Sequence, residues 1–277
     1  MKYILATILA MVALIALASA ASSGGTREDG VNHIMQGNEA HSDGDFVPGT
    51  IFQEQSNSLI VIGRDNTIDQ SNYAYAITYT DSASILQRQR NLAVLLGDSN
   101  TLAQSNHARA VNYGSDCAIA QIQNSIAIVV GSNNEMSQDN DADAEIVGGE
   151  DNAIAQEQSN IGIQLGKFNK MYQRNEVDAG EGIFDYPGSY FQQHQTNLGI
   201  EVGDGTEISG SDLNQDNYAG AWDYSDNNQV SQTGINIALL IGAQHSIQNN
   251  NQDVKTYQEG SIINQNAANL NLLVGIV

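Results

Sequence analysis

The chain has 277 residues, of which only 15% are charged, and its formal net charge is −22. Such an acidic, lysine-poor composition excludes nucleic acid as a partner class, because nucleic-acid binding requires a basic surface. The single cysteine, Cys117, excludes an internal disulfide framework and is either a plain loop residue or an intermolecular cross-link.

Residues 1–20 predict a secretory signal peptide. Lys2 provides the positive start, residues 4–17 are almost wholly apolar, and small residues at 18–20 provide a cleavage site. The apolar run is short for a membrane span of about 20 residues. Cleavage before Ala21 leaves nine Lys and Arg against 32 Asp and Glu, a net charge of −23. We therefore expect an extracellular or cell-surface protein with no membrane span after cleavage.

Residues 21–50 predict an N-terminal half-unit and a linker. Asn32, Ile34, Gln36 and Asn38 follow a pattern that returns 34 residues later from Asn66 onward, where it forms the second strand of a repeat. No first-strand pattern precedes this copy.

Residues 51–277 predict an array of about seven units. The central glycines of these units are separated by 34, 34, 35, 37, 39 and 33 residues; they are Gly63, Gly97, Gly131, Gly166, Gly203, Gly242 and Gly275. Such regular self-similarity is the signature of a repeat protein.

The first strand of each unit ends just before this glycine. The positions five, three and one residues before it are apolar, as in Leu92, Val94 and Leu96. Two-residue periodicity predicts a strand with these residues on its buried face and the amides on the opposite face, so both faces could be covered. The amides are Gln53, Gln55, Asn57, Gln87, Gln89, Asn91, Gln156, Gln158 and Asn160.

A Gly-x-x-Asn turn and a second strand follow. The turn residues are Gly63, Asn66, Gly97, Asn100, Gly131, Asn134, Gly166 and Asn169, and we expect both residue types to adopt positive φ there. The second strand places Asn, an apolar residue, Gln, Asn and Ala on one face, with amides at Gln70, Asn72, Gln104 and Asn106. The sequence thus predicts an all-β solenoid, or stacked β-arches or hairpins; helical repeats are excluded by the two-residue spacing.

Stacking equivalent strands at about 4.7 Å would place identical amides above one another in cross-β-like columns. Each amide both donates and accepts, so a column satisfies itself, with a net gain of about 1 kcal/mol per hydrogen bond.

The C-terminal unit is also half a unit, because residues 265–275 form a first strand with no second strand after it. An apolar strand edge invites strand addition. We expect this half-unit to pair with the N-terminal half-unit of the next copy, giving a closed ring or an open filament. The expected junction residues are Asn32, Ile34, Gln36, Asn38, Leu270, Leu272 and Val274.

The Gln and Asn columns with a Gly-x-x-Asn turn resemble the curlin repeats of bacterial curli, which form extracellular functional amyloid. With the signal peptide and the acidity, residues 29–277 look still more like the tubular sheath proteins of methanogenic archaea. That resemblance implies a cell-envelope protein that forms stacked hoops.

No catalytic motif occurs, and we expect neither an enzyme nor a cofactor. Asp139, Asp141, Asp143 and Glu145 could bind calcium, although they lack the glycine turn of a calcium-binding loop. Other acids, including Asp178, are expected in loops after the second strands.

The function expected is a secreted structural protein whose copies assemble head-to-tail into a sheath, hoop or fibre. Two alternatives remain. One is a monomeric β-solenoid adhesin or ligand-binding module, such as an ice-binding one; the other is a repeat-built polysaccharide enzyme.

Overall fold

The computed structural model describes residues 33–44, 49–147, 151–181, 190–202, 211–223, 229–241, 244–256 and 262–274. These residues contain fourteen strands and no helix, as the two-residue periodicity predicts. The strands are β1 (His33–Gly44), β2 (Thr50–Ile62), β3 (Thr67–Thr78), β4 (Ser84–Leu96), β5 (Thr101–Asn112), β6 (Ala118–Val130), β7 (Glu135–Ile146), β8 (Ala153–Leu165), β9 (Lys170–Glu181), β10 (Tyr190–Val202), β11 (Ser211–Asp223), β12 (Gln229–Ile241), β13 (Gln244–Thr256) and β14 (Ile262–Val274).

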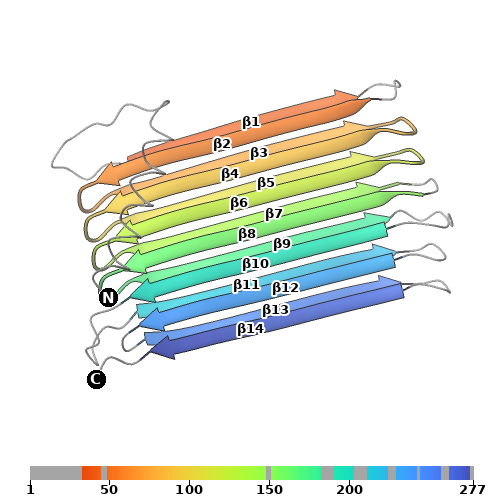
Figure 1. Ribbon diagram of the computed structural model, residues 1–277. Coiled ribbons are helices and arrows are strands. Elements are labelled where there is room, and N and C mark those ends of the chain that lie inside the picture. Colours follow the sequence, from red (N-terminus) through yellow and green to blue (C-terminus); the bar gives the residue numbers. More distant parts are fainter. Residues whose placement is uncertain are drawn as a thin grey trace, which may run out of the picture.

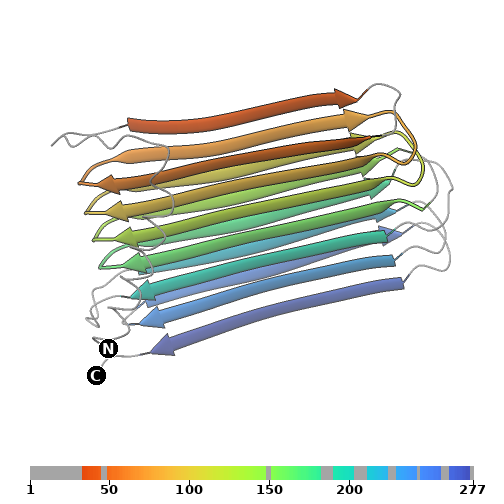
Figure 2. The same cartoon turned by 45° about the horizontal axis from the view of Figure 1, so that its top comes forward.

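The strands form two facing parallel sheets (Figure 1). Sheet A has the order β1-β3-β5-β7-β9-β11-β13, and sheet B has the order β14-β12-β10-β8-β6-β4-β2. Successive strands therefore belong to opposite sheets, so each unit is a β-arch and not a hairpin. Figure 2 shows the two layers separated, with the strands of each layer stacked in one direction. The prediction of a β-solenoid with about 34 residues per turn is confirmed.

The register keeps equivalent residues of the units side by side. Gln70 of β3 lies between Gln36 of β1 and Gln104 of β5. The pairing survives where a unit is longer: Asn175 of β9 pairs with Asn217 of β11, 42 residues on. Extra residues are therefore accommodated between strands, and the register of the strands is kept.

The buried face of the sheet B strands is the amide face, which corrects our prediction. In β4, Gln87, Gln89 and Asn91 are at most 1% exposed, whereas Leu92 and Leu96 lie on the outer face. Hydrogen bonds along and between the columns satisfy the amides, so the usual cost of burying them is removed. The second-strand prediction was right, since Asn66, Ile68, Gln70, Asn72 and Ala74 all face inward and are buried.

Apolar clusters flank the amide columns on both sides. One cluster, which includes Leu95, Leu102 and Met136, lies near the Gly-x-x-Asn turns. The other, which includes Ile119 and Phe191, lies at the opposite end of the strands. The interior is therefore apolar at its two margins and polar along its middle.

The turns use glycine as predicted but use asparagine differently. Gly97 and Gly131 both have φ of +142°, while the other positive-φ residue of each turn precedes the asparagine, as with Ser99 at +59°. The asparagines form a ladder of their own. The Nδ2 of Asn66 donates to Oδ1 of Asn100 at 2.9 Å, and the backbone N–H of Asn100 donates to Oδ1 of Asn134 at 2.8 Å.

Candidate functional site: the two ends of the stack

The glutamine columns tie the stack together in two directions. Nε2 of Gln104 donates to Oε1 of Gln70 at 2.8 Å, along the column of sheet A. It also donates to the backbone carbonyl of Ile126 in sheet B at 3.2 Å. Each glutamine of this kind links its strand both to the neighbouring strand and to the facing sheet.

The asparagine columns of the two sheets interleave. Nδ2 of Asn72 in sheet A donates to Oδ1 of Asn106 in the same sheet at 2.9 Å and to Oδ1 of Asn91 in sheet B at 3.0 Å. Ser125 takes the asparagine place in β6, and its Oγ donates to Oδ1 of Asn140 at 3.2 Å. The sequence predicted separate columns and missed this interleaving, because the pairing of the sheets is not encoded in the spacing.

The hydrogen bonds of the columns have a constant direction. Glutamine amides donate toward the N-terminal end of the stack, as Gln70 does to Gln36 and Gln248 does to Gln215. Asparagine amides donate toward the C-terminal end, as Asn38 does to Asn72 and Asn217 does to Asn250. Sheet B follows the same rule, since Gln265 donates to Gln232 and Asn236 donates to Asn269.

The columns that contain Gln36, Asn38, Gln53 and Asn57 continue into the end strands, whereas the column of Gln55 stops at Gln195, because Gly234 and Ala267 take its place in β12 and β14. In the described part of the chain, β1 and β2 at one end and β13 and β14 at the other each have one neighbour in their sheet. The amides there are more exposed than those in the middle: Gln36 and Asn38 are half-buried, and Gln265 and Asn269 are exposed. The ends therefore present amide columns that stop at an open edge.

The structure places most of the predicted junction residues, and it places them on different faces of their strands. Ile34, Gln36 and Asn38 lie on the inner face of β1, while Leu270 and Leu272 lie on the outer face of β14 and are 60% and 55% exposed. Asn32 lies outside the described residues, as do residues 1–20, and the side chain of Val274 is not described.

The predicted junction of the two half-units stays a prediction, and the sheet topology limits its form. Strand β1 belongs to sheet A and β14 to sheet B, so the two half-units cannot pair within one sheet. The strand of sheet A with an open edge at the C-terminal end is β13.

The hydrogen bonds of the inner strands indicate which backbone N–H groups point to the open edges. The N–H of Thr101 in β5 donates to the carbonyl of Asn66, and the N–H of Ser84 in β4 donates to the carbonyl of Gly49. Residues of a parallel strand alternate between their two neighbours. In the shared register, the N–H of Glu39 in β1 and that of Glu54 in β2 therefore point to the open edge.

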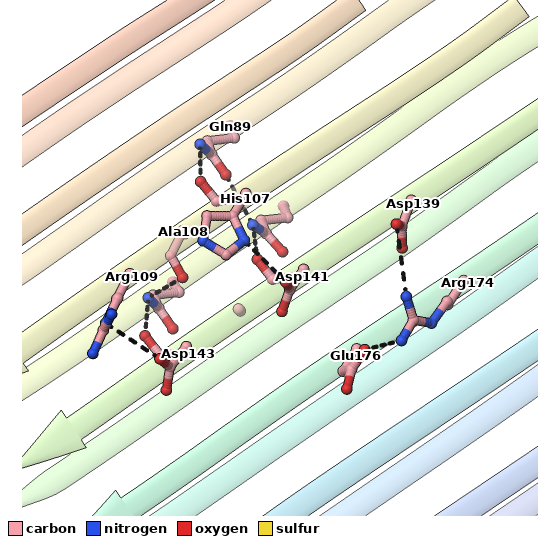
Figure 3. Close-up of polar contacts among 12 residues, drawn as sticks. Gln89, His107, Ala108, Arg109, Asp139, Asp141, Asp143, Arg174 and Glu176 are labelled. Atoms are coloured by element: carbon pink, nitrogen blue, oxygen red, sulfur yellow. Dashed lines mark hydrogen bonds and ion pairs between the residues drawn. The ribbon is translucent and has the colours of Figure 1, made fainter.

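The outer face of sheet A is acidic. Its described side chains include three cations, Arg109, Lys170 and Arg174, and eleven carboxylates, which are Glu39, Asp43, Asp69, Glu135, Asp139, Asp141, Asp143, Glu145, Glu176, Asp178 and Asp216. Figure 3 shows the ion pairs at its centre. Nδ1 of His107 lies 2.9 Å from Oδ2 of Asp141, and Nε of Arg109 lies 3.4 Å from Oδ2 of Asp143. Arg174 contacts Asp139 and Glu176.

The four acids considered for calcium lie in a row along β7. They project from every second residue, and three of them contact His107, Arg109 or Arg174. Within the described ranges, no three His, Cys, Asp or Glu residues are grouped so that they could hold a metal ion. The neighbouring cations are one register step away, so the repeat spacing of the sequence is the signal that would have predicted these ion pairs.

Burial and like charges alter the titration of this face. Burial raises the pKa of Asp139 and that of Asp143. The pKa of Asp178 is raised to about 6, first by burial and then by the carboxylates of Glu176 and Asp143. Asp178 lies within β9, which corrects its predicted loop position. The hydrogen bond to Asp141 raises the pKa of His107.

Cys117 lies in the turn between β5 and β6 and is 1% exposed. Its Sγ lies 3.1 Å from the backbone oxygen of Ser115. Such a buried thiol fits the loop-residue interpretation better than the cross-link.

The part of the chain that the structure describes contains no helix long and apolar enough to cross a membrane. Comparison of the chain with protein-family models, with curated proteins and with solved structures finds no match.

Proposed function

We propose that this protein is a secreted structural protein whose copies stack end to end into an extracellular sheath, hoop or fibre. The observation that carries the proposal is the direction of the amide columns, which stays constant up to both open ends. A kinship with the methanogen sheath proteins or the curlin-like amyloid proteins is part of the same proposal, and it is supported by the repeat pattern, the predicted signal peptide and the acidic composition.

The ends fit one another without any change of register. When β1 of the next copy adds to β13, Gln36 of that copy meets Gln248 and Asn38 meets Asn250. Nε2 of Gln36 can then donate to Oε1 of Gln248, and Nδ2 of Asn250 can donate to Oδ1 of Asn38. These are the directions in which Gln70 donates to Gln36 and Asn38 donates to Asn72 inside the subunit.

Sheet B fits in the same step. Strand β2 of the next copy adds to β14, so that Gln53 of that copy meets Gln265 and Asn57 meets Asn269. Parallel pairing of two strands at once restores main-chain hydrogen bonds in both sheets and covers the exposed inner face of β14. The contact is heterologous, so it continues indefinitely or closes into a ring.

The experiment compares the mature chain (residues 21–277) with two double variants at the N-terminal edge. Glu39→Pro/Glu54→Pro removes two N–H donors that point to the open edge, and proline is tolerated on an edge strand. Glu39→Ala/Glu54→Ala is the matched control, since it removes the same side chains and keeps the N–H groups.

Negative-stain electron microscopy in salt should show assemblies many subunits long for the mature chain and for the alanine control. The proline variant should stay as folded single subunits with the β circular-dichroism spectrum of the parent. Long assemblies of the proline variant would refute end-to-end stacking. Monodisperse single subunits of the parent under all salt and calcium conditions would favour the adhesin alternative.

A further inference from the structure

The outer face of sheet B carries an aliphatic stripe, which we define as the last three outward-facing positions of each of its seven strands. In β8 these are Ile161, Ile163 and Leu165. All of these positions except Ser58 hold Leu, Ile or Val. Most of the described side chains are half-buried or exposed, and Ile62 is 76% exposed. The stripe plays no part in end-to-end stacking, which uses the strand edges.

The charges of the two outer faces differ in a way that selects a partner. The outer face of sheet A has a net excess of carboxylates, as described above. The outer face of sheet B carries two acids, Glu54 and Glu157, and two arginines, Arg88 and Arg90, so its net charge is zero. Two copies can therefore approach through sheet B without the repulsion that sheet A would cause.

The repeat of the stripe suits a second copy of itself. Its side chains lie in register along the stack, as Ile126 does beside Ile161 and Ile161 does beside Leu198. They thus recur at the strand spacing of about 4.8 Å. Only a surface with the same repeat can interdigitate along the whole stripe, as the facing sheets of a steric zipper do.

The area of the stripe is also adequate. Seven strands at about 4.8 Å by five residues at about 3.3 Å give roughly 500 Å² in projection for each copy. Two copies would bury on the order of 1,000 Å², the lower limit of a specific interface. An apolar stripe that lengthened with every stacked subunit would exceed the patches that soluble proteins leave exposed.

We propose that the aliphatic stripe is a lateral interface at which two copies of this chain pack face to face through their B sheets. The pair has sheet A outermost on both sides, so that the acidic faces meet solvent. A stack of subunits thereby becomes a double layer.

The first test is made on edge-blocked subunits (Glu39→Pro/Glu54→Pro, from residue 21), so that end-to-end stacking cannot contribute. These subunits start at residue 21, so the apolar segment 4–17 is absent and cannot bind to the stripe. Sedimentation velocity should show a concentration-dependent dimer. Adding Ile126→Thr/Ile163→Thr/Leu198→Thr, at half-buried positions of the stripe, should shift it to monomer, with at least a tenfold rise in the dimer dissociation constant. The matched control Ile77→Thr/Val111→Thr, on the outer face of sheet A, should leave the dimer unchanged.

The second test uses chains with intact edges and separates this inference from the proposed function. The lateral interface predicts that the parent chain forms double-width assemblies. With the threonine substitutions, these assemblies should become single-width and keep their length. Dimers that form no long assemblies would contradict end-to-end stacking but not the lateral interface. Single-width assemblies of the parent chain, or dimers that persist with the threonine substitutions, would overturn the lateral interface.

A third measurement does not depend on altering the stripe. In a Cys117→Ser background, spin labels at Ser159→Cys, on the outer face of sheet B, should give a short distance between copies of the edge-blocked chain. Labels at Ser105→Cys, on the outer face of sheet A, should give none. Equal results for the two positions would contradict packing through sheet B.

Discussion

Gln104 and Gln36 occupy the same column, yet their surroundings differ. Gln104 lies in the middle of the stack, is 1% exposed and has column neighbours on both sides. Gln36 lies in an end strand, is half-buried and has one described column neighbour, Gln70. The difference shows that the column is closed on both sides in the middle of the stack, whereas the same side chain in an end strand is partly exposed and has one described column neighbour.

Substitution of a turn glycine should give the largest difference in stability between the middle of the stack and its end. A Cβ on Gly131 would lie 2.0 Å from the backbone oxygen of Gly97, and Gly131 has φ of +142°. Gly131→Ala should therefore prevent folding or destabilise the chain by more than about 4 kcal/mol. A Cβ on Gly63, at the N-terminal end, meets only Nδ2 of Asn66, at 3.2 Å.

Thermal denaturation followed by circular dichroism would compare the two glycine variants. Gly63→Ala should lower the free energy of unfolding only by the backbone strain of alanine at this φ, on the order of 1–2 kcal/mol. A larger loss for Gly63→Ala than for Gly131→Ala would contradict the close stacking of the turns.

Substitution of a column asparagine should give a smaller difference in stability, again with the larger loss in the middle of the stack. Asn140→Leu breaks the hydrogen bonds to Asn106, Asn160 and Asn175 in a buried column and should cost about 3 kcal/mol or more. Asn38→Leu, in the end strand, should cost about 1 kcal/mol, because its surroundings are partly open to water. Urea denaturation of edge-blocked subunits measures both values, and equal losses would argue against the distinction between middle and end.

The pH dependence of Asp178 should give the smallest effect. Its folded-state pKa of about 6 lies above the unfolded value of about 3.9. The ionised form is therefore disfavoured by folding, so its destabilisation is absent below about pH 4 and complete above about pH 6. Asp178→Asn should raise the melting temperature by a few degrees at pH 7.5 and leave it unchanged at pH 4. If Asp178→Asn were stabilising at pH 4 as well, the ionisation of Asp178 would not be the cause.

The sequence was sufficient for the repeat, the strands and the amide columns, because residues such as Gln70 and Gln104 recur at a fixed spacing. It misassigned the buried face of the sheet B strands. Leu92 and Leu96 are aliphatic and Gln89 is polar, so the free energy of transfer from water favours burial of the leucines. Only the column of identical amides, with acceptors on the facing sheet, makes the opposite arrangement favourable.

The candidate site was predicted in part. The half-units at the termini pointed to the ends, and Gln36 and Asn38 lie there. The proposed pairing of β1 with β13 of another copy could not be specified while the hairpin and the arch were both possible, because a hairpin would have put both strands of a unit in one sheet. The direction of the amide donors depends on side-chain orientation, which no spacing in the sequence reveals.

The most direct test of end-to-end stacking adds edge-blocked subunits to the unblocked mature chain. A Glu39→Pro/Glu54→Pro subunit cannot add to the C-terminal end of a stack, but its own C-terminal edge can accept the N-terminal end of one. A few per cent of this variant should therefore terminate assemblies and reduce their mean length in electron micrographs, while the alanine control should not. Unchanged lengths at an equimolar ratio would show that the copies do not join through these edges.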